Sequence, residues 1–223
     1  MKKARFFFLL IYLGLFLSFE NKEILFGIDI SHYQGEIDWE EVVRDSSISF
    51  VITRSTMGDD RKDKLFNKHI KEIRKHGFIV GIYHYYDPNE NSTKQANNFI
   101  QTAKLLPGDL APILDIERMP RNKDKKKFIA DIKNWLYIVE KKYKTKPMIY
   151  TYLKFYNHNL KKDFGKDYPL WIAVYSDSLQ ATISEDCHMI QCSNKEKIAG
   201  IKNHVDGNEI TAHKLKELLI KLN

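Results

Sequence analysis

The sequence predicts an irregular eight-stranded β/α barrel of the TIM type, and three observations support this fold class. From Lys22 onward, short apolar runs alternate with charged helical segments, which is typical of a parallel sheet. The early runs are almost continuously apolar, as expected for strands covered on both faces. Eight such runs occur within about 200 residues, and eight is the strand number of the closed β/α barrel.

The same patterns place the individual elements. We expect strands at 24–30, 48–55, 78–86, 111–117, 147–152, 169–175, 187–193 and 201–206. We expect helices at 38–45, 64–77, 91–108, 124–144 and 211–222, the longest with an apolar stripe at helical spacing. Helices become scarce after the fifth strand, where residues 176–186 resemble a loop, so the barrel is predicted to be irregular.

The composition is that of a soluble globular protein with excess positive charge. Hydrophobic residues make up 43% of the 223 residues, and the net charge is +7. A basic protein favours anionic partners such as nucleic acids, membrane surfaces or anionic polymers. No recognisable nucleic-acid-binding motif is present, and the dense run 123–127 is interpreted as a solvated helix face. We therefore expect no nucleic-acid partner.

Residues 1–21 predict export. Basic residues precede an apolar run from Phe6 to Leu17, which is short for a membrane span of about 20 residues and typical of a secretory signal. No clear cleavage site follows, so an uncleaved N-terminal anchor is the alternative. We expect residues 22–223 to form one β/α-barrel domain that is secreted, periplasmic or anchored at the cell envelope by this segment, with no other membrane partner.

The two cysteines, Cys187 and Cys192, lie in one predicted strand. Five residues of strand separate their ends by roughly 16 Å, at about 3.3 Å per residue. A disulfide requires Cα atoms within about 7 Å. We therefore expect two separate thiols.

Two carboxylates, Asp115 and Glu117, stand at the end of the fourth predicted strand. In a β/α barrel the active site lies at the C-terminal ends of the strands. Side chains two residues apart share one face of a strand, so both should point into the barrel mouth. Asp29 ends the first predicted strand and Asp206 the last one. The sequence thus predicts four acids at one mouth.

A carboxylate cluster fits several chemistries. Crowded acids in a partly dry site raise one pKa, which suits general acid catalysis in glycoside hydrolysis. Carboxylates are also ligands for hard divalent cations. An isolated pair is usually only a solvated strand end, and it is the additional acids at the same mouth that favour a functional site.

Several blocks together resemble a known family. GIDISHYQGEIDW, FVITRSTMG, GFIVGIYHYY, PILDIE, PMIYTY, PLWIAVY and VDGNEI occur in the order seen in glycoside hydrolase family 25, the N-acetylmuramidase lysozymes. The resemblance runs from about Phe26 to Ile210. It implies a flattened eight-stranded barrel with few outer helices. It also implies cleavage of the bond from N-acetylmuramic acid to N-acetylglucosamine in peptidoglycan, with the family's four acids at Asp29, Asp115, Glu117 and Asp206.

Three positions depart from the family pattern. A late strand that usually reads Trp-Gln-Tyr-Ser has Ile190, Gln191, Cys192 and Ser193 here, so two aromatic residues are missing. Met57 stands where a polar or acidic residue is common, and Gly207 where an aliphatic residue is common. All four acids are present, so we expect an active enzyme with an altered substrate groove.

The expected roles follow from side-chain length and position. Glu117 reaches furthest into the mouth and is the expected general acid, with its pKa raised by Asp115 beside it. Asp115 stabilises an intermediate formed by the 2-acetamido group, or an acid across the mouth activates water and the enzyme inverts. Asp29 and Asp206 should hold hydrogen bonds and local charge. No metal or other cofactor is required.

The expected substrate-binding residues are mostly aromatic. They are Tyr83, Tyr85, Tyr150, Trp171, Arg54 and Gln191, with barrel core as the alternative role of the aromatic ones. Arg54 could pair with Asp29 or Asp115, while His32 and His84 are expected to be structural. We expect the protein to be a monomer and its partner to be the glycan strands of peptidoglycan.

Two rival functions remain open at this point. One is a cell-wall-binding module without turnover, favoured by the missing aromatic residues. The other is a metal-dependent phosphodiesterase that uses Asp29, Asp115 and Glu117, for which only His32 lies nearby in sequence as a histidine ligand.

Overall fold

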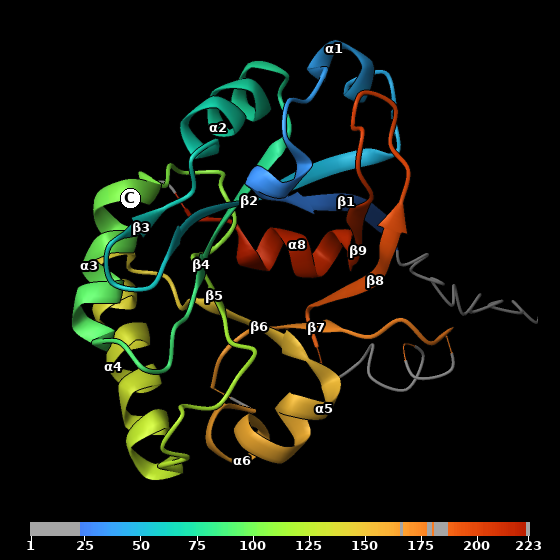
Figure 1. Cartoon of the computed structure of the whole chain (residues 1–223). Helices are drawn as coiled ribbons and strands as arrows, with labels where there is room; N and C mark the ends of the chain where they lie inside the picture. The colour runs from blue at the N-terminus through green and yellow to red at the C-terminus, as the bar shows by residue number, and fades with distance from the viewer. Residues whose placement is uncertain (1–22, 166, 178–179, 181–186, 222–223) are drawn as a thin grey trace, which may run out of the picture.

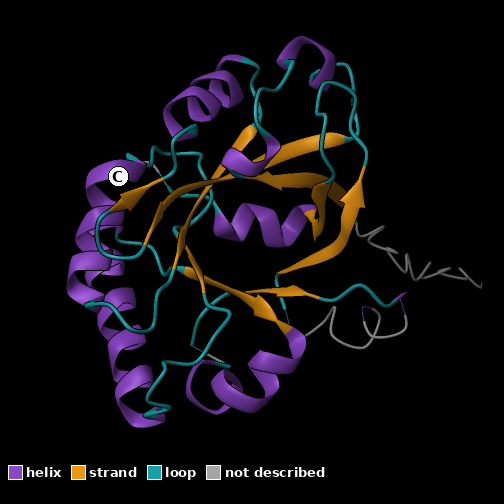
Figure 2. Cartoon of the chain, in the orientation of Figure 1, coloured by secondary structure: helices purple, strands orange, loops and turns teal. Residues whose placement is uncertain are grey.

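A computed structural model describes residues 23–165, 167–177, 180 and 187–221, which form a closed β-barrel with helices around it (Figures 1 and 2). Eight strands follow one another in the order β1-β9-β8-β7-β6-β5-β4-β2, and pairing of β1 with β2 completes the circle. The two-residue strand β3 adds to the outer side of β2 as an antiparallel extension. The predicted mixed α/β fold with a closed eight-stranded barrel is confirmed.

The observed strands agree closely with the predicted ones over most of the chain. They are β1 Ile24–Ile30, β2 Ile48–Met57, β3 Arg61–Lys62, β4 Ile79–Tyr85, β5 Ile113–Asp115, β6 Met148–Tyr152, β7 Leu170–Ala173, β8 Met189–Glu196 and β9 Val205–Thr211. The fourth predicted strand is reduced to three residues, and the last one begins four residues later than predicted.

The prediction of a parallel sheet is wrong for β9. This strand runs antiparallel to both of its neighbours, β1 and β8, whereas the pairs from β1–β2 through β7–β8 around the barrel are parallel. Asp206 is therefore the second residue of β9 rather than the end of a strand. Because β9 is reversed, its beginning lies at the mouth, and Asp206 pairs directly with Asp29 of β1.

The main helices lie where their periodicity and capping residues place them. They are α1 Trp39–Val42, α2 Phe66–Lys75, α3 Ser92–Ala103, α4 Lys125–Tyr143 and α8 Ala212–Leu218. The side chains of Asn91 and Asp124 accept hydrogen bonds from backbone N–H groups in the first turns of α3 and α4. A short 3₁₀ turn, His32–Gln34, follows β1.

One helical segment was not predicted. Residues 153–164 form three consecutive short helices, namely α5 Leu153–Phe155, a π-helical turn Tyr156–Leu160, and α6 Lys161–Phe164. They bury Phe155, Leu160 and Phe164. The segment is too short and too interrupted to show a sustained helical period in the sequence.

Two hydrophobic clusters hold the barrel together. One lies between the sheet and the outer helices and includes Leu114, Ile116 and Trp135. The other fills the barrel interior and includes Phe50 and Ile113. Helix α8, which crosses behind the barrel in Figure 1, adds Leu215 and Leu218 to the interior cluster. One end of the barrel is thus closed by α8, and the opposite end stays available for a site.

The predicted signal or anchor at residues 1–21 lies outside the described residues, as does most of the predicted loop at 176–186. Among the helices of the described ranges, none combines the length and apolar character needed to cross a membrane.

Candidate active site

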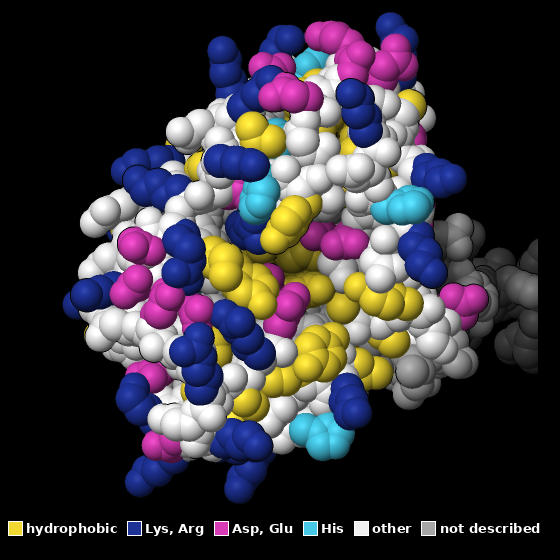
Figure 3. All heavy atoms as spheres, viewed as in Figure 1, with side chains coloured by type: hydrophobic (Ala, Val, Ile, Leu, Met, Phe, Trp, Pro, Cys, Tyr) yellow, Lys and Arg dark blue, Asp and Glu magenta, His cyan; other side chains and the backbone are white. Residues whose placement is uncertain are grey.

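The four predicted acids meet in one cleft at the barrel mouth. Asp29, Asp115, Glu117 and Asp206 line an open cleft of about 250 Å³, together with Tyr83, Tyr85, Arg54 and Tyr33. Figure 3 shows hydrophobic and acidic side chains gathered around a hollow in the middle of this face. Residues from the five strands β1, β2, β4, β5 and β9 and from the segment that follows β5 therefore converge at one place.

Strand geometry explains the position of the pair at the end of β5. Asp115 is the last residue of the strand, and Glu117 follows two positions later. Ile116 between them is fully buried and belongs to the cluster under the helices. The alternation thus directs one apolar side chain outward and two carboxyl groups into the mouth, as the sequence predicted.

The side chain of Asp29 is buried and accepts hydrogen bonds from two uncharged amide groups. Its Oδ2 accepts hydrogen bonds from Gln191 Nε2 and Asn208 Nδ2, each at 2.9 Å. Burial, and then the nearby charge of Asp206, raise the pKa of Asp29 to about 8, although the two amide donors oppose this rise. Burial and the charge of Glu117 likewise raise the pKa of Asp206 to about 6. At neutral pH the cleft therefore retains at least one proton.

Asp115 is 5% exposed, and its Oδ1 has no hydrogen-bond partner among the described residues. Burial raises its pKa well above the usual range, and the charges of Glu117 and Asp29 add to the effect, while Arg54 opposes it. A buried carboxyl oxygen without a donor is costly, so it marks a place where a ligand N–H group could bind.

Glu117 is more accessible than Asp115. Its Oε2 accepts a long hydrogen bond of 3.4 Å from the Tyr85 hydroxyl. Burial raises the pKa of Glu117, while Tyr85 and Arg118 act in the opposite direction. The sequence argument attributed this rise to Asp115. The structure attributes it to burial instead, and the repulsion between the two carboxylates raises the pKa of Asp115.

Three predicted substrate-binding residues lie in the barrel interior below the cleft. Trp171, Tyr150 and Gln191 are at most 9% exposed and do not line the cleft. They form a network instead, in which Trp171 Nε1 donates to Asn208 Oδ1 at 2.9 Å and the Tyr150 hydroxyl donates to Gln191 Oε1 at 2.9 Å. Because Gln191 and Asn208 both donate to Asp29, this network orients Asp29.

The prediction that Arg54 pairs with Asp29 or Asp115 is wrong. Its guanidinium pairs with Asp63 rather than with Asp29 or Asp115, with Arg54 Nε donating to Asp63 Oδ2 at 3.1 Å. The same carboxylate oxygen accepts the backbone N–H of His32 at 3.0 Å. Asp63 lies in the bend after β3, a position that β-strand pairing rather than local sequence brings next to Arg54.

The two histidines take structural positions, as expected. His32 Nδ1 lies 2.8 Å from Asp63 Oδ2. His84 is fully buried between Thr56 Oγ1, at 2.8 Å, and Gln95 Oε1, at 3.1 Å. Burial lowers the pKa of His84 to about 4, so its imidazole is neutral. Within the described ranges, no group of three or more His, Cys, Asp or Glu side chains is arranged to hold a metal ion.

Sequence reasoning missed several residues of the site. Tyr33 is 68% exposed on the rim of the cleft, with its ring centroid 5.3 Å from the Arg54 guanidinium carbon. The Tyr175 hydroxyl donates to Gln191 Oε1 at 2.7 Å, and Asn208 supports Asp29. Tyr33, Tyr175 and Asn208 all lie within the sequence blocks that carry the family resemblance, so a signal for them was present.

The amino-acid sequence is similar to those of known proteins. The sequence pattern described as "Glycosyl hydrolases family 25" matches residues 28–201, a range that holds three of the four acids. The chain belongs to glycosyl hydrolases family 25. It is 33% identical over 186 residues to the uncharacterized protein YegX of Escherichia coli K12, covering 82% of this chain and 68% of that one.

Solved structures of family 25 share the barrel. A family 25 lysozyme from Aspergillus fumigatus has a TM-score of 0.76 at 26% identity, covering 88% of this chain and 99% of that one. The modular autolysin LytC of Streptococcus pneumoniae, in complex with a synthetic peptidoglycan ligand, has a TM-score of 0.72 at 23% identity, covering 83% of this chain and 46% of that one. The latter similarity concerns the fold alone.

The two missing aromatic residues of the family 25 pattern fall on β8, whereas Met57 ends β2 and Gly207 lies in β9. Ile190 packs against the cluster under the helices, and the Cys192 thiol donates to the Gly207 carbonyl at 3.3 Å. Burial raises the pKa of Cys192 to about 11. Cys187 and Cys192 are separate thiols, as the strand spacing predicted. Positions 190 and 192 hold no aromatic residue, and the aromatic groups that bond to Gln191 are Tyr150 and Tyr175.

Proposed function

We propose that this chain is a lysozyme-type muramidase, which cleaves the β-1,4 bond between N-acetylmuramic acid and N-acetylglucosamine in peptidoglycan. The observation that carries the proposal is the convergence of four carboxyl groups in one open cleft, with the accessible Glu117 next to the buried Asp115. Membership of family 25 supports the same reaction class.

Glu117 is the proposed general acid. Its carboxyl group is the more accessible member of the pair, and burial raises its pKa, which favours the protonated form that an acid catalyst needs. That proton passes to the glycosidic oxygen as the bond to the leaving sugar breaks. The resulting Glu117 carboxylate then accepts a proton from the water that completes hydrolysis.

Asp115 is the proposed partner of the sugar's 2-acetamido group. Its unpaired Oδ1 lacks a donor, and an acetamido N–H supplies one. A hydrogen bond to the charged form lowers the pKa of a carboxyl group, so substrate binding favours the Asp115 carboxylate. The acetamido oxygen can then attack the anomeric carbon, and the carboxylate stabilises the positive intermediate. In the alternative, an acid across the mouth activates water directly, and the product anomer is inverted.

The decisive experiment is digestion of purified peptidoglycan by the full chain, with and without a chelator. The proposal predicts chelator-resistant release of soluble fragments with new reducing ends on N-acetylmuramic acid. Binding to the wall without any release would instead support a binding module on the same fold. Chelator-sensitive cleavage of phosphate esters would support the metal-dependent phosphodiesterase.

We further propose that the protein acts outside the cytoplasm, with residues 1–21 as a signal or anchor. The support is the charge and length of that segment together with the location of the proposed substrate. Fractionation of producing cells tests this, and recovery of all the protein in the cytoplasm contradicts it.

A further inference from the structure

A second cleft in the described part of the chain lies outside the catalytic cleft. It has a volume of about 310 Å³ and is formed by residues 88–91, residues 120–124 and the first two turns of α4. Its lining is mainly polar and includes three acids, Glu90, Asp124 and Asp131, and two basic residues, Arg121 and Lys127. The proposed reaction at Glu117 makes no use of this second cleft.

A single ion pair separates the two clefts. Arg118, directly after Glu117, pairs with Asp87 at 2.8 Å, and its guanidinium carbon lies 5.8 Å from the centroid of the Tyr85 ring. Tyr85 lines the catalytic cleft, and Asp87 precedes the loop that lines the second one. Arg121 N donates to Asn89 Oδ1 at 2.9 Å and ties the two loops together. The same two chain segments, 83–91 and 115–124, thus contribute to both clefts, so the clefts lie next to each other.

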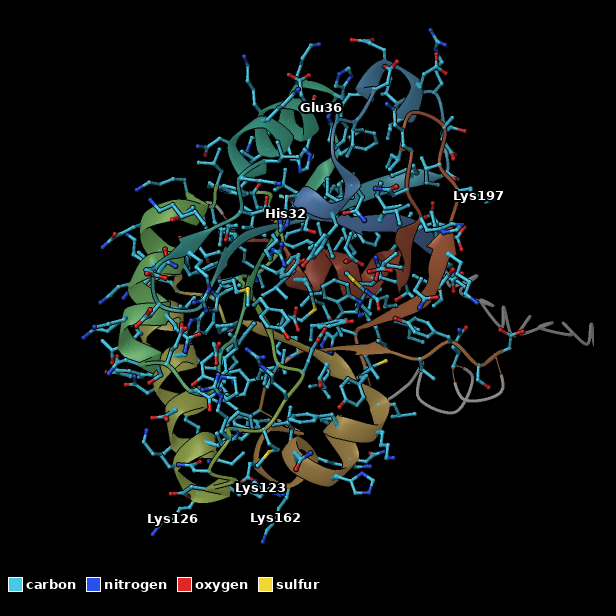
Figure 4. All side chains as sticks on the ribbon, viewed as in Figure 1. His32, Glu36, Lys123, Lys126, Lys162 and Lys197 are labelled. Carbon is cyan, nitrogen blue, oxygen red and sulfur yellow. The ribbon has the colours of Figure 1, made fainter. Side chains whose placement is uncertain are left out.

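Beyond the second cleft the surface is strongly basic. Residues 121–133 and 154–163 hold nine Lys and Arg side chains, all exposed, against three Asp. The remaining described residues hold 22 basic and 23 acidic side chains, so the net charge of the described chain lies on this basic surface. Figure 4 shows Lys123, Lys126 and Lys162 projecting from the same lower end of the molecule.

The two segments of the basic surface are joined in space. Lys125 Nζ donates to the His158 carbonyl at 3.1 Å, and Lys133 Nζ lies 5.8 Å from the centroid of the Phe164 ring. Two of the three acids are already engaged. Asp124 caps α4, and Asp131 accepts a hydrogen bond from Lys127 Nζ at 2.6 Å. The side chains of Arg121, Lys126 and Lys162 make no hydrogen bond or ion pair with other described residues and are available to an anionic ligand.

We propose that the second cleft and the basic surface bind the stem peptide of peptidoglycan, the short peptide that hangs from the lactyl group of muramic acid. This inference rests on the proposed muramidase function and extends it to substrate recognition. A stem peptide offers free carboxylates for the exposed basic side chains and backbone amides for the polar lining of the cleft. The position next to the catalytic cleft favours a ligand covalently attached to the glycan over an independent phosphate polymer.

The test compares two soluble glycans, one bearing stem peptides and one stripped of them by an amidase. The variant Arg121→Gln, Lys126→Gln, Lys162→Gln removes three exposed charges. The matched control Lys71→Gln, Lys141→Gln, Lys142→Gln removes three exposed charges elsewhere. The ratio of kcat/KM values, peptide-bearing over stripped, should fall by roughly threefold or more in the first variant, since each exposed pair contributes modestly. The control should keep the wild-type ratio.

Titration with the free stem pentapeptide provides a readout independent of turnover. The wild-type chain should bind it, and the first variant should bind it more weakly than the control. This binding measurement tests the inference even if neither glycan is cleaved. The absence of cleavage would itself contradict the muramidase proposal. An unchanged ratio together with no peptide binding overturns the inference. Loss of binding by the first variant only to poly(glycerol phosphate) or to anionic lipid vesicles overturns it as well, in favour of a phosphate ligand.

Discussion

Two buried carboxyl groups at the barrel mouth, Asp29 and Asp63, behave in opposite ways. They are 8% and 9% exposed. Burial raises the pKa of both, and at Asp29 this effect dominates, because only two neutral amides donate to it and Asp206 lies nearby. At Asp63, hydrogen bonds from His32 and from the backbone of Leu65, followed by the charge of Arg54, outweigh burial and lower the pKa.

The contrast shows that burial alone does not fix the charge of a carboxyl group. The number and charge of its donors decide whether it keeps a proton or keeps a negative charge. The cleft thus contains acids with raised pKa values, such as Asp29, and beside it lies the Asp63 carboxylate, which stays ionised. General acid chemistry needs an environment that raises the pKa of a carboxyl group, whereas the ion pair with Arg54 needs an ionised Asp63.

The largest expected effect concerns the proton held at Glu117. Glu117→Gln should lower the rate of muropeptide release by about 10²–10⁴-fold, because the amide cannot protonate the leaving oxygen. Wall binding and the fold should persist. Release of new reducing ends from purified peptidoglycan gives the rate, and co-sedimentation gives the binding.

Asp115→Asn should also slow release, for a different reason. A nitrophenyl glycoside of the chitobiose type, if it is accepted, carries a good leaving group and should partly rescue Glu117→Gln but not Asp115→Asn. The reverse rescue pattern would mean that the two roles are exchanged. If neither substitution slows release, the pair at the end of β5 is not the catalytic centre.

A stability experiment compares the two environments directly. Asp63→Asn leaves the buried guanidinium of Arg54 without its counter-charge and should reduce the free energy of unfolding by about 3 kcal/mol. Asp29→Asn replaces a protonated acid with a nearly isosteric amide and should change it by less than about 1 kcal/mol. Urea unfolding at pH 7 measures both. Equal losses would contradict the assignment of opposite charge states.

The pH dependence of stability should have opposite signs at the two sites. A carboxyl group with a raised pKa binds more protons in the folded state, so its stabilising contribution is present below about pH 4 and is lost as pH rises toward 8. The contribution of Asp63 is present above its unfolded pKa and is lost as pH falls below that value. The wild-type free energy of unfolding should therefore decline from pH 5 to 8.

Asp29→Asn should make the free energy of unfolding decline less between pH 5 and 8. Asp63→Asn should keep that decline and should instead reduce the loss of unfolding free energy at acidic pH. Unfolding curves collected at intervals between pH 3 and pH 9 resolve the two slopes. A steeper alkaline decline in Asp29→Asn would show that Asp29 is ionised in the folded protein.

The smallest expected effect comes from the single long hydrogen bond to Glu117. Tyr85→Phe removes a donor that lowers the pKa of Glu117, so the alkaline limb of kcat/KM should move slightly to higher pH. Tyr175→Phe is the control, because its hydroxyl donates to Gln191 and not to Glu117. A shift to lower pH in Tyr85→Phe would mean that the hydroxyl stabilises the protonated acid.

The sequence by itself determined the barrel and the location of its acids. Runs of apolar residues define where β1, β2, β4 and β6 begin and end, because burial on both faces requires continuous hydrophobicity. The alternation of strand side chains then places Asp115 and Glu117 on one face with Ile116 on the other. Asp29 is found in the same way, since it stands near the end of an apolar run.

Only the tertiary structure decided how strands are oriented and which groups meet. The reversal of β9 depends on pairing with β1 and β8, which no local pattern encodes, yet it brings Asp206 opposite Asp29. The choice of Asp63 as the partner of Arg54, and the inward position of Trp171, follow from strand pairing and packing in the same way. The protonation states of the acids also depend on the tertiary structure, because residues on distant strands supply the burial and the hydrogen-bond donors that set each pKa.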